Sequence, residues 1–343
     1  MSPLVSVLMA TRNNARFLPD AVESVLGQSF RDLELVIGDN ASDDETPAIV
    51  ARYRQRDDRI VYFRNAENLG ATANFNRCYR RADPTSKYFV FFPSDDLWEP
   101  LFLERLVTVA ESHPEVTVVH ADAYRTDPTG RIIGKHSDLY RRLPPPGEHR
   151  CVRELYEGCY ILAPAALVNR VMQRRIYPVE DIFHPGLAWS PDFDLWLQLM
   201  TRGAKAYYVP EPLAYHRRHE GAMAMPRNLV GMLRDAVTIF DQRLEGVCPP
   251  ELEPARQEAL RARLAALGSE LLLAGQLEAG RLALDRARRI PARPPRPDLA
   301  VAWAIASLPL PSALRRQVWQ LAVAAKRALL GVGRGAALVH RTP

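Results

Sequence analysis

Apolar and polar positions alternate in blocks along the first third of the chain. Short, mostly apolar runs, typical of buried strands, occur at 4–10, 33–37, 60–63, 88–92 and 116–120. Between these runs, apolar residues recur at helical spacing in the ranges 17–27, 46–56, 71–81 and 101–111. Apolar strands that alternate with amphipathic helices are typical of a parallel sheet with helices on both faces. The pattern therefore predicts an α/β fold.

The middle of the chain follows a less regular pattern. It indicates short helices at 154–160 and 165–174, a helix at 194–200 and a strand at 206–209. Because these elements continue the α/β pattern, we expect one α/β domain over residues 1–225.

The composition changes at residue 254, where Ala, Leu and Arg begin to dominate. Residues 255–274 and 277–289 have helical spacing and flank Gly275, which predicts an antiparallel helical hairpin. We therefore expect a helical extension with this hairpin over 226–290, followed by a proline-rich linker and a basic helical tail over 291–343.

The positive charge of the chain is concentrated in its tail. The 343 residues carry a net charge of +5, yet residues 292–343 alone hold eight Lys and Arg against one acidic residue. A nucleic-acid-binding domain would carry its basic face and stacking aromatics on the folded part, so we expect no nucleic-acid partner. Within the tail, 312–330 is amphipathic and basic, which predicts contact with an anionic membrane surface. Packing of its apolar face on the helical hairpin is the alternative.

The cysteines and the apolar run near the N-terminus indicate where in the cell the protein is located. The four cysteines form neither a CxxC pair nor a disulfide pattern, which is typical of reduced thiols in a cytosolic protein. The apolar run 4–10 is too short for a signal peptide, and Arg12 follows it directly. We therefore expect a cytoplasmic protein, with the tail placing it at the inner face of the membrane.

Polar side chains follow each of the first four predicted strands. In strand order, the candidates are Thr11, Asn13, Asp39, Asn68, Asp95 and Asp96. Ligands of parallel sheets bind at the carboxyl ends of the strands, so these side chains are candidates for one site. Taken singly, each is also an ordinary turn or helix-cap residue, and Asp96 with Glu99 could form a capping box.

The first strand lacks the glycines of a dinucleotide-binding domain. The stretch "ATRNNARF", residues 10–17, contains no glycine, and the chain has no P-loop. Phosphate groups must therefore be held in another way. The adjacent carboxylates of Asp95 and Asp96 suit Mg²⁺ or Mn²⁺, which bridge protein and diphosphate.

Three segments in this order resemble glycosyltransferase family 2, whose members have the nucleotide-sugar-binding GT-A fold. They are "VSVLMATRNNARFLPDAVESVLGQSFRDLELVIGDNASDDET", "NLGATANFN" and "FPSDDLWEP". The likeness continues through "SPDFDLWLQLMTRG" and "YHRRHEGAMA". The resemblance implies an inverting enzyme that moves a sugar from a nucleotide-diphosphate donor to an acceptor hydroxyl. The acceptor would be a glycan or a lipid-linked molecule in the synthesis of cell-surface polysaccharide or glycolipid.

The resemblance also implies residue roles. The nucleotide-sugar would be bound by Thr11, Asn13, Asp39, Asn68, Gly70 and Asp95. Asp96 would be the direct metal ligand. His219 would approach the metal or the diphosphate, and His216 is the competing histidine.

Asp192 would be the general base that accepts the proton of the acceptor hydroxyl. It stands at a predicted helix start, where Ser190 and Pro191 equally suit a structural N-terminus without function. Because a helix N-terminus lowers the pKa of a carboxyl, we expect a weak base. Its neighbour Asp194 is expected to stabilise the helix start.

Two positions depart from the family pattern. Pro93 stands where a further carboxylate often precedes the metal pair, and Pro191 stands where an acid often precedes the base. Two alternatives stay open, of which only the degenerate site draws support from these two prolines. One is a nucleotidyltransferase, which would release pyrophosphate, and the other is a nucleotide-sugar-binding protein with a degenerate site.

Overall fold

The computed structural model describes residues 2–222, 225–291 and 317. The chain divides into a compact N-terminal unit that ends at Ala222 and a second unit that begins at Met223. Apart from residue 317, the predicted amphipathic tail at 312–330 lies outside the described residues.

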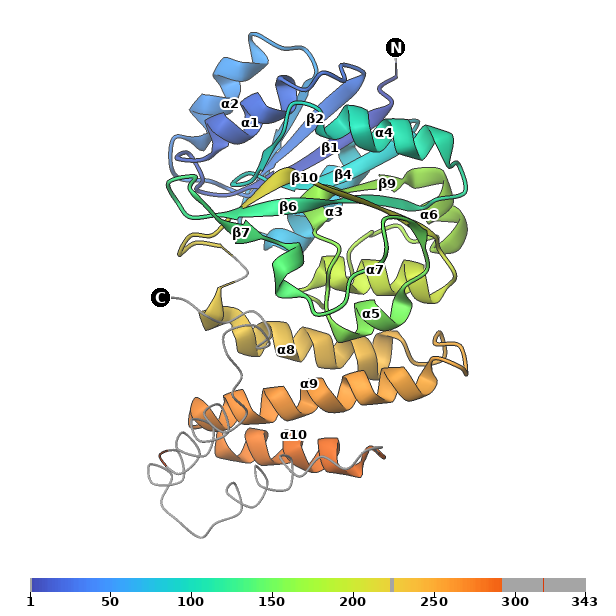
Figure 1. The fold of residues 1–343 in the computed structure, drawn as a ribbon. Coiled ribbons are helices and arrows are strands. Elements are labelled where there is room, and N and C mark those ends of the chain that lie inside the picture. Colours follow the sequence, from blue (N-terminus) through green and yellow to red (C-terminus); the bar gives the residue numbers. More distant parts are fainter. Residues whose placement is uncertain (1, 223–224, 292–316, 318–343) are drawn as a thin grey trace. The chain divides into compact units, whose positions relative to one another are not determined.

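One mixed sheet forms the centre of the N-terminal unit (Figure 1). In spatial order its main strands are β3 (Ile60–Arg64), β2 (Leu33–Asp39), β1 (Val5–Thr11), β4 (Tyr88–Pro93), β9 (Ala166–Asn169), β6 (Val118–Thr126), β10 (Ala206–Arg217) and β5 (Leu97–Trp98). Two short strands join it, since β7 (Ile132–Lys135) pairs with β6 and β8 (Gly147–His149) pairs with β10. The four strands from β3 to β4 are parallel, and so are β6 and β10. This arrangement confirms the predicted α/β class.

Helices cover both faces of this sheet (Figure 1). The N-terminal unit contains α1 (Leu18–Leu26), α2 (Thr46–Arg54), α3 (Ala71–Arg81), α4 (Phe102–Ser112), α5 (Val152–Glu157), α6 (Arg170–Ile176) and α7 (Pro191–Thr201), with the short 3₁₀ turns η1 (Ser137–Leu139) and η2 (Ala163–Ala165). Figure 1 shows α1, α2 and α4 on one side of the sheet, and α3 and α7 on the other.

Successive side chains of β1 point to opposite faces of the sheet, and apolar residues occupy both faces. Val5, Val7 and Met9 are fully buried and belong to one apolar cluster with Leu18 of α1 and Leu106 of α4. Leu8 is also fully buried but lies outside that cluster, as expected for the opposite face of a strand. A strand buried on both sides therefore appears in the sequence as a continuous apolar run.

The predicted helix at 165–174 is wrong in its first half. Residues Ala166–Asn169 form β9, which lies antiparallel between β4 and β6, and only Arg170–Ile176 is helical. The Asn169 side chain ends the strand and begins the helix, since it accepts hydrogen bonds from the backbone N–H groups of Val171 and Met172. The four residues of the strand, three of them apolar, are too few to separate a strand from a helix by spacing.

The second unit is helical. Its elements are η3 (Pro226–Asn228), α8 (Leu229–Thr238), the π-helical turn η4 (Ile239–Arg243), α9 (Glu253–Leu273) and α10 (Leu277–Arg289). Gly275 has a φ of +80° between α9 and α10, a left-handed conformation that glycine adopts without strain. Among the described helices, none combines the length and the apolar character needed to cross a bilayer.

Two glycines allow α9 and α10 to pack closely. A Cβ added at Gly280 would lie 3.0 Å from the carbonyl oxygen of Gly268 and 2.9 Å from Cγ of Leu272. A Cβ at Gly268 would meet the carbonyl oxygen of Gly280 at 2.9 Å. Backbone atoms cannot move aside as a flexible side chain can, so both positions need glycine.

Gly280→Ala should loosen the hairpin. Alanine favours a helix over glycine by about 1 kcal/mol, but forcing the helices apart costs about 1–3 kcal/mol. We expect faster amide hydrogen exchange in peptides from α9 and α10. Leu282→Ala is the matched control, because Leu282 lies on the same helix and is largely exposed. Equal exchange in the Gly280 variant and the parent would show that this close approach does not matter.

Candidate active site at the carboxyl edge of the sheet

The strand register brings the predicted site residues to one edge. Thr11 of β1 pairs with Asp39 of β2, and Ala10 pairs with Pro93 of β4. The three strands therefore end side by side. Their following loops must share the space beyond that edge.

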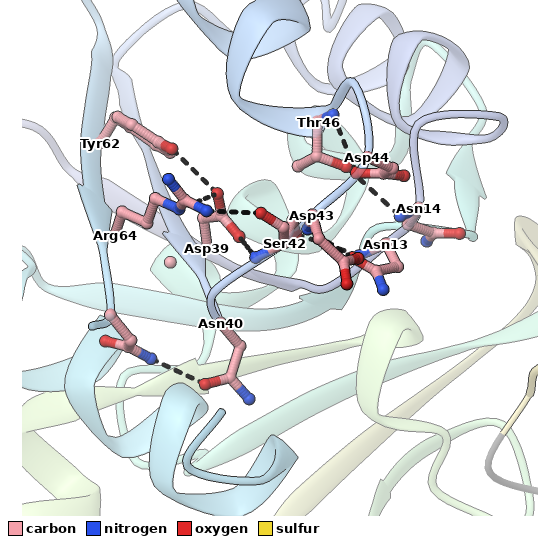
Figure 2. A network of polar contacts seen from close by, with 12 residues as sticks. Asn13, Asn14, Asp39, Asn40, Ser42, Asp43, Asp44, Thr46, Tyr62 and Arg64 are labelled. Atoms are coloured by element: carbon pink, nitrogen blue, oxygen red, sulfur yellow. Dashed lines mark hydrogen bonds and ion pairs between the residues drawn. The ribbon is translucent and has the colours of Figure 1, made fainter. Parts of the chain in front are cut away.

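Asp39 stabilises the loop after β2 from within (Figure 2). It is 0% exposed. One carboxylate oxygen accepts the backbone N–H of Ser42 at 2.8 Å, and the other accepts the hydroxyl of Tyr62 at 3.0 Å. Arg64 adds an ion pair at 3.6 Å from Nε to Oδ2. The sequence predicts a nucleoside contact for Asp39, whereas the structure shows a carboxylate whose two oxygens are already bonded within the chain.

Asn13 joins the loop after β1 to the loop after β2 (Figure 2). Its backbone N–H donates to the hydroxyl of Ser42 at 3.0 Å, and its side-chain oxygen accepts the N–H of Asp43 at 3.0 Å. Its φ is +48°, a left-handed conformation that asparagine tolerates better than most residues. Asn13 is exposed, unlike Thr11, whose hydroxyl is buried and accepts from Ser94 at 2.9 Å.

Asn68 and Gly70 belong to a network of asparagines that begins α3. The amide of Asn40 donates to Oδ1 of Asn68 at 2.7 Å, and Oδ1 of Asn40 accepts from Asn65 at 2.9 Å. Gly70 has a φ of +82°, and its N–H donates to Oδ1 of Asn68 at 3.0 Å. The sequence missed Asn40 and Asn65 as site residues, although both stand in the polar stretches after the second and third strands. Their amides hold the loop that carries Asn68 and Gly70.

The carboxylates of Asp95 and Asp96 have different surroundings. Asp96 is 2% exposed, and its Oδ1 accepts the backbone N–H of Arg217 at 2.9 Å. Burial, and then the charge of Asp95, raise the pKa of Asp96 well above its usual range. Asp95 instead contacts His219, with 2.8 Å from Oδ2 to Nε2. The carboxylate that faces the predicted histidine is therefore Asp95 rather than Asp96.

The capping-box interpretation of Asp96 is wrong. Helix α4 begins at Phe102, and its N-cap position is Leu101, five residues after Asp96. The backbone N–H of Glu99 donates to Leu213 of β10 at 2.9 Å, so this segment is held by the sheet and does not cap a helix.

His219 has both ring nitrogens engaged. Its Nδ1 accepts the backbone N–H of Gly221 at 3.1 Å, so Nε2 carries the proton that is donated to Asp95. His216 has no comparable contact with the carboxylate pair. Burial lowers the pKa of His216 to about 3, and the charge of Asp95 opposes that shift only in part. The geometry thus favours His219 over His216 as the histidine of the site.

Asp192 occupies the first turn of α7. Burial raises its pKa to about 6, because burial outweighs the backbone N–H groups of Phe193 and of Asp192 itself, which lower it. We expected the helix N-terminus to lower the pKa of Asp192, and that expectation is wrong. Burial raises the pKa of the Cys159 thiol, and the charge of Asp192 adds to that shift. Asp194 is buried and accepts from Nε2 of Gln198 at 3.2 Å, within the same helix.

The residues present fit a divalent cation that also binds phosphate oxygens. In the part of the chain that the structure describes, three or more His, Cys, Asp or Glu side chains nowhere gather closely enough to hold a metal alone. Carboxylate oxygens with one imidazole nitrogen still suit Mn²⁺ or Mg²⁺. Mg²⁺ is commonly bound by one or two carboxylates, with water and substrate phosphates as its other ligands.

Comparison with known proteins identifies the domain. The family model described as "Glycosyl transferase family 2" matches residues 6–174. The putative glycosyltransferase EpsE of Bacillus subtilis is 29% identical over 242 residues, which cover 69% of this chain and 81% of that protein. The putative teichuronic acid biosynthesis glycosyltransferase TuaG of the same organism is 27% identical over 215 residues, which cover 63% of this chain and 79% of TuaG.

Solved structures share the fold. The S. aureus TarS 1–349 structure in complex with UDP has a TM-score of 0.63 at 16% identity, and the match covers 98% of this chain and 95% of that one. The mannosyltransferase PcManGT from Pyrobaculum calidifontis, solved with GDP-Man and Mn²⁺, has a TM-score of 0.57 at 19% identity and covers 97% and 89%. Residues 6–174 are therefore a glycosyltransferase family 2 domain, and the chain has the GT-A fold.

Proposed function

We propose that this chain transfers a sugar from a nucleoside-diphosphate donor to an acceptor hydroxyl, with inversion at the anomeric carbon. The observation that carries the proposal is the carboxyl of Asp192, whose pKa is raised to about 6. A base works best when its pKa is close to the working pH. Asp192 lies in the same N-terminal unit as the Asp95–His219 pair, and we propose that both act on one sugar.

The loops after β1, β2 and β3 would hold the nucleoside. Asn13, Asn68 and Gly70 lie in loops that the asparagine and serine hydrogen bonds make rigid. Thr11 and Asp39 are buried, so we assign them to the support of these loops, beneath the nucleoside. The names of solved relatives include UDP, UDP-GlcNAc and GDP-Man, which supports a nucleotide-sugar without selecting its base.

A cation, Mg²⁺ or Mn²⁺, would be held by Asp95 and by Nε2 of His219, once that nitrogen has given up the proton that it donates to Asp95. When bound, it would neutralise the charge that develops on the departing diphosphate. Within the chain, Arg217 fixes Asp96 through its backbone N–H, and His219 fixes Asp95. These contacts hold two adjacent carboxylates in place before any ligand arrives.

The transfer would be a single displacement. Asp192 accepts the proton of the acceptor hydroxyl, and the acceptor oxygen bonds to the anomeric carbon. The bond from that carbon to the diphosphate oxygen breaks, and its electron pair leaves with the nucleoside diphosphate. One attack from the face opposite the leaving group inverts the configuration.

The acceptor would be a glycan or a lipid-linked molecule used in cell-surface polysaccharide. The support is the name of TuaG, which refers to teichuronic acid biosynthesis. We also propose a cytoplasmic location with contact to an anionic membrane through 312–330. Co-sedimentation with anionic vesicles, for the full chain and a chain ending at Arg289, tests that contact.

Removing the cation should stop donor turnover. We expect an excess of EDTA to abolish activity and added Mn²⁺ to restore it. Asp95→Ala should lower turnover by about a hundredfold or more, the scale of a lost charge-stabilising group. The melting temperature should change little, because Asp95 is partly exposed.

Asp58→Ala is the control for this experiment. Asp58 is an exposed aspartate that contributes nothing to the site, so its variant should keep parental turnover. Full activity of the parent chain in excess EDTA would refute the metal proposal.

Asp192→Asn should lower kcat by about a hundredfold or more, the scale of general-base loss. Donor affinity should stay close to that of the parent. Asp194→Asn is the comparison, since the buried contact with Gln198 predicts a lower melting temperature there. A parental kcat for the Asp192 variant, or a loss explained wholly by donor binding, would show that Asp192 is not the base.

The pH dependence of kcat/KM should reflect the ionisation of the Asp192 carboxyl. A base acts in its ionised form, so kcat/KM of the parent should fall as the pH drops below about 6. In Asp192→Asn the residual rate should lose this dependence. A variant that keeps the same acidic limb would assign the ionisation to another group.

A further inference from the structure

Phe17 lies at the start of α1, directly after the loop that carries Asn13. Its side chain is 7% exposed. The ring contacts Arg217, the last residue of β10, and His219, which follows that strand. Cζ of Arg217 lies 4.5 Å from the ring centroid, and the imidazole centroid of His219 lies 4.8 Å away at an interplanar angle of 49°.

Arg217 links this ring to the carboxylate pair. It is 5% exposed, and its backbone N–H donates to Asp96. Its Nη2 lies 3.4 Å from Oδ2 of Asp20, in the same helix that Phe17 begins. A guanidinium held over an aromatic face is attracted by the ring's negative face, so the Arg217–Phe17 contact holds the end of β10 against α1.

Hydrogen bonds connect the backbone of Phe17 to the segment that precedes the carboxylates. Its N–H donates to the carbonyl oxygen of Asn14 at 3.0 Å, and the Asn14 amide donates to the hydroxyl of Ser94 at 2.8 Å. Ser94 directly precedes Asp95. The ring is therefore placed by the same segment that adjoins the carboxylates.

His219 depends on such support because it lies two residues beyond the last residue of β10. Its neighbour Arg218 still donates its N–H to Thr126 of β6 at 2.8 Å, whereas the carbonyl oxygen of His219 accepts the N–H of Ala222 in a turn at 3.0 Å. Its ring edge meets Asp95 and Gly221, and one neighbour of its face is Phe17.

We propose that Phe17 is a positioning residue for the cation site. Its ring keeps the imidazole of His219 directed at Asp95, and its contact with Arg217 keeps the strand end in register with Asp96. This inference rests on the proposed function, since it assigns Phe17 to the cation site described there. It can be tested separately from the cation site, because the phenyl ring of Phe17 has no atom that could bind a cation as Asp95 and His219 would.

The test is the affinity of the full chain for Mn²⁺, read from the electron paramagnetic resonance signal of free Mn²⁺. The titration is run with Mn²⁺ alone and repeated with UDP or GDP present. Phe17→Leu keeps an apolar side chain but removes the aromatic face, and should weaken Mn²⁺ binding about tenfold. Phe17→Tyr keeps the face and should stay within about twofold of the parent.

Phe63→Leu is the matched control. The Phe63 ring also lies beside two guanidinium groups, those of Arg77 at 5.6 Å and Arg81 at 5.7 Å, and it is outside the site. This variant should bind Mn²⁺ as the parent does, even if both leucine variants melt at a lower temperature.

The outcomes separate the two proposals. Parental Mn²⁺ affinity in Phe17→Leu, or equal weakening in Phe63→Leu, overturns the role of Phe17 and leaves the cation site intact. Weak binding in Phe17→Tyr as well as in Phe17→Leu also overturns it, because the aromatic face would not be what matters. Absence of Mn²⁺ binding to the parent overturns the cation site and the role of Phe17 with it.

Discussion

The parallel register of β1 with β2 and β4 is the constraint on which the site depends. It sets Thr11 beside Asp39 and Ala10 beside Pro93, so three loops begin at one edge of a buried sheet. Because these strands are buried on both faces and mostly apolar, polar side chains gather at their carboxyl ends and in the loops that follow. The rigid strands thus fix where the carboxylates of Asp95 and Asp96 stand.

Several polar side chains at this edge are buried, among them Asp39 and Asn74, and their hydrogen bonds make that burial possible. An unpaired buried polar group costs about 1–3 kcal/mol. Asp39 is bonded to Ser42 and Tyr62, and Asn74 donates to the carbonyl oxygen of Gly38 at 2.7 Å. The loops are therefore already ordered around the site, so a nucleotide would not have to order them on binding. Such preorganisation reduces the entropy lost when a ligand binds.

The local pattern of apolar and polar residues was enough to predict the α/β fold and the edge of the sheet that carries the site. The apolar runs located the parallel strands, and the polar residues after them located the edge of the site. Spacing could not identify β9, whose four residues fit a strand or a helix equally. Nor could it show that Asp39 is enclosed by Tyr62, that His219 meets Asp95, or that burial raises the pKa of Asp192 to about 6. Each of these depends on tertiary packing between segments that are distant in sequence, which a local pattern does not contain.

The central claim is that this edge binds a nucleoside diphosphate and a cation together. Anomalous diffraction at the manganese absorption edge, from crystals of the full chain grown with Mn²⁺ and a bound nucleoside diphosphate, tests it most directly. The account predicts one manganese peak bonded to Asp95 and to the diphosphate, with the nucleoside over the loops of Asn13 and Asn68. A nucleotide bound at this edge without manganese, or manganese bound away from Asp95 and His219, would contradict it.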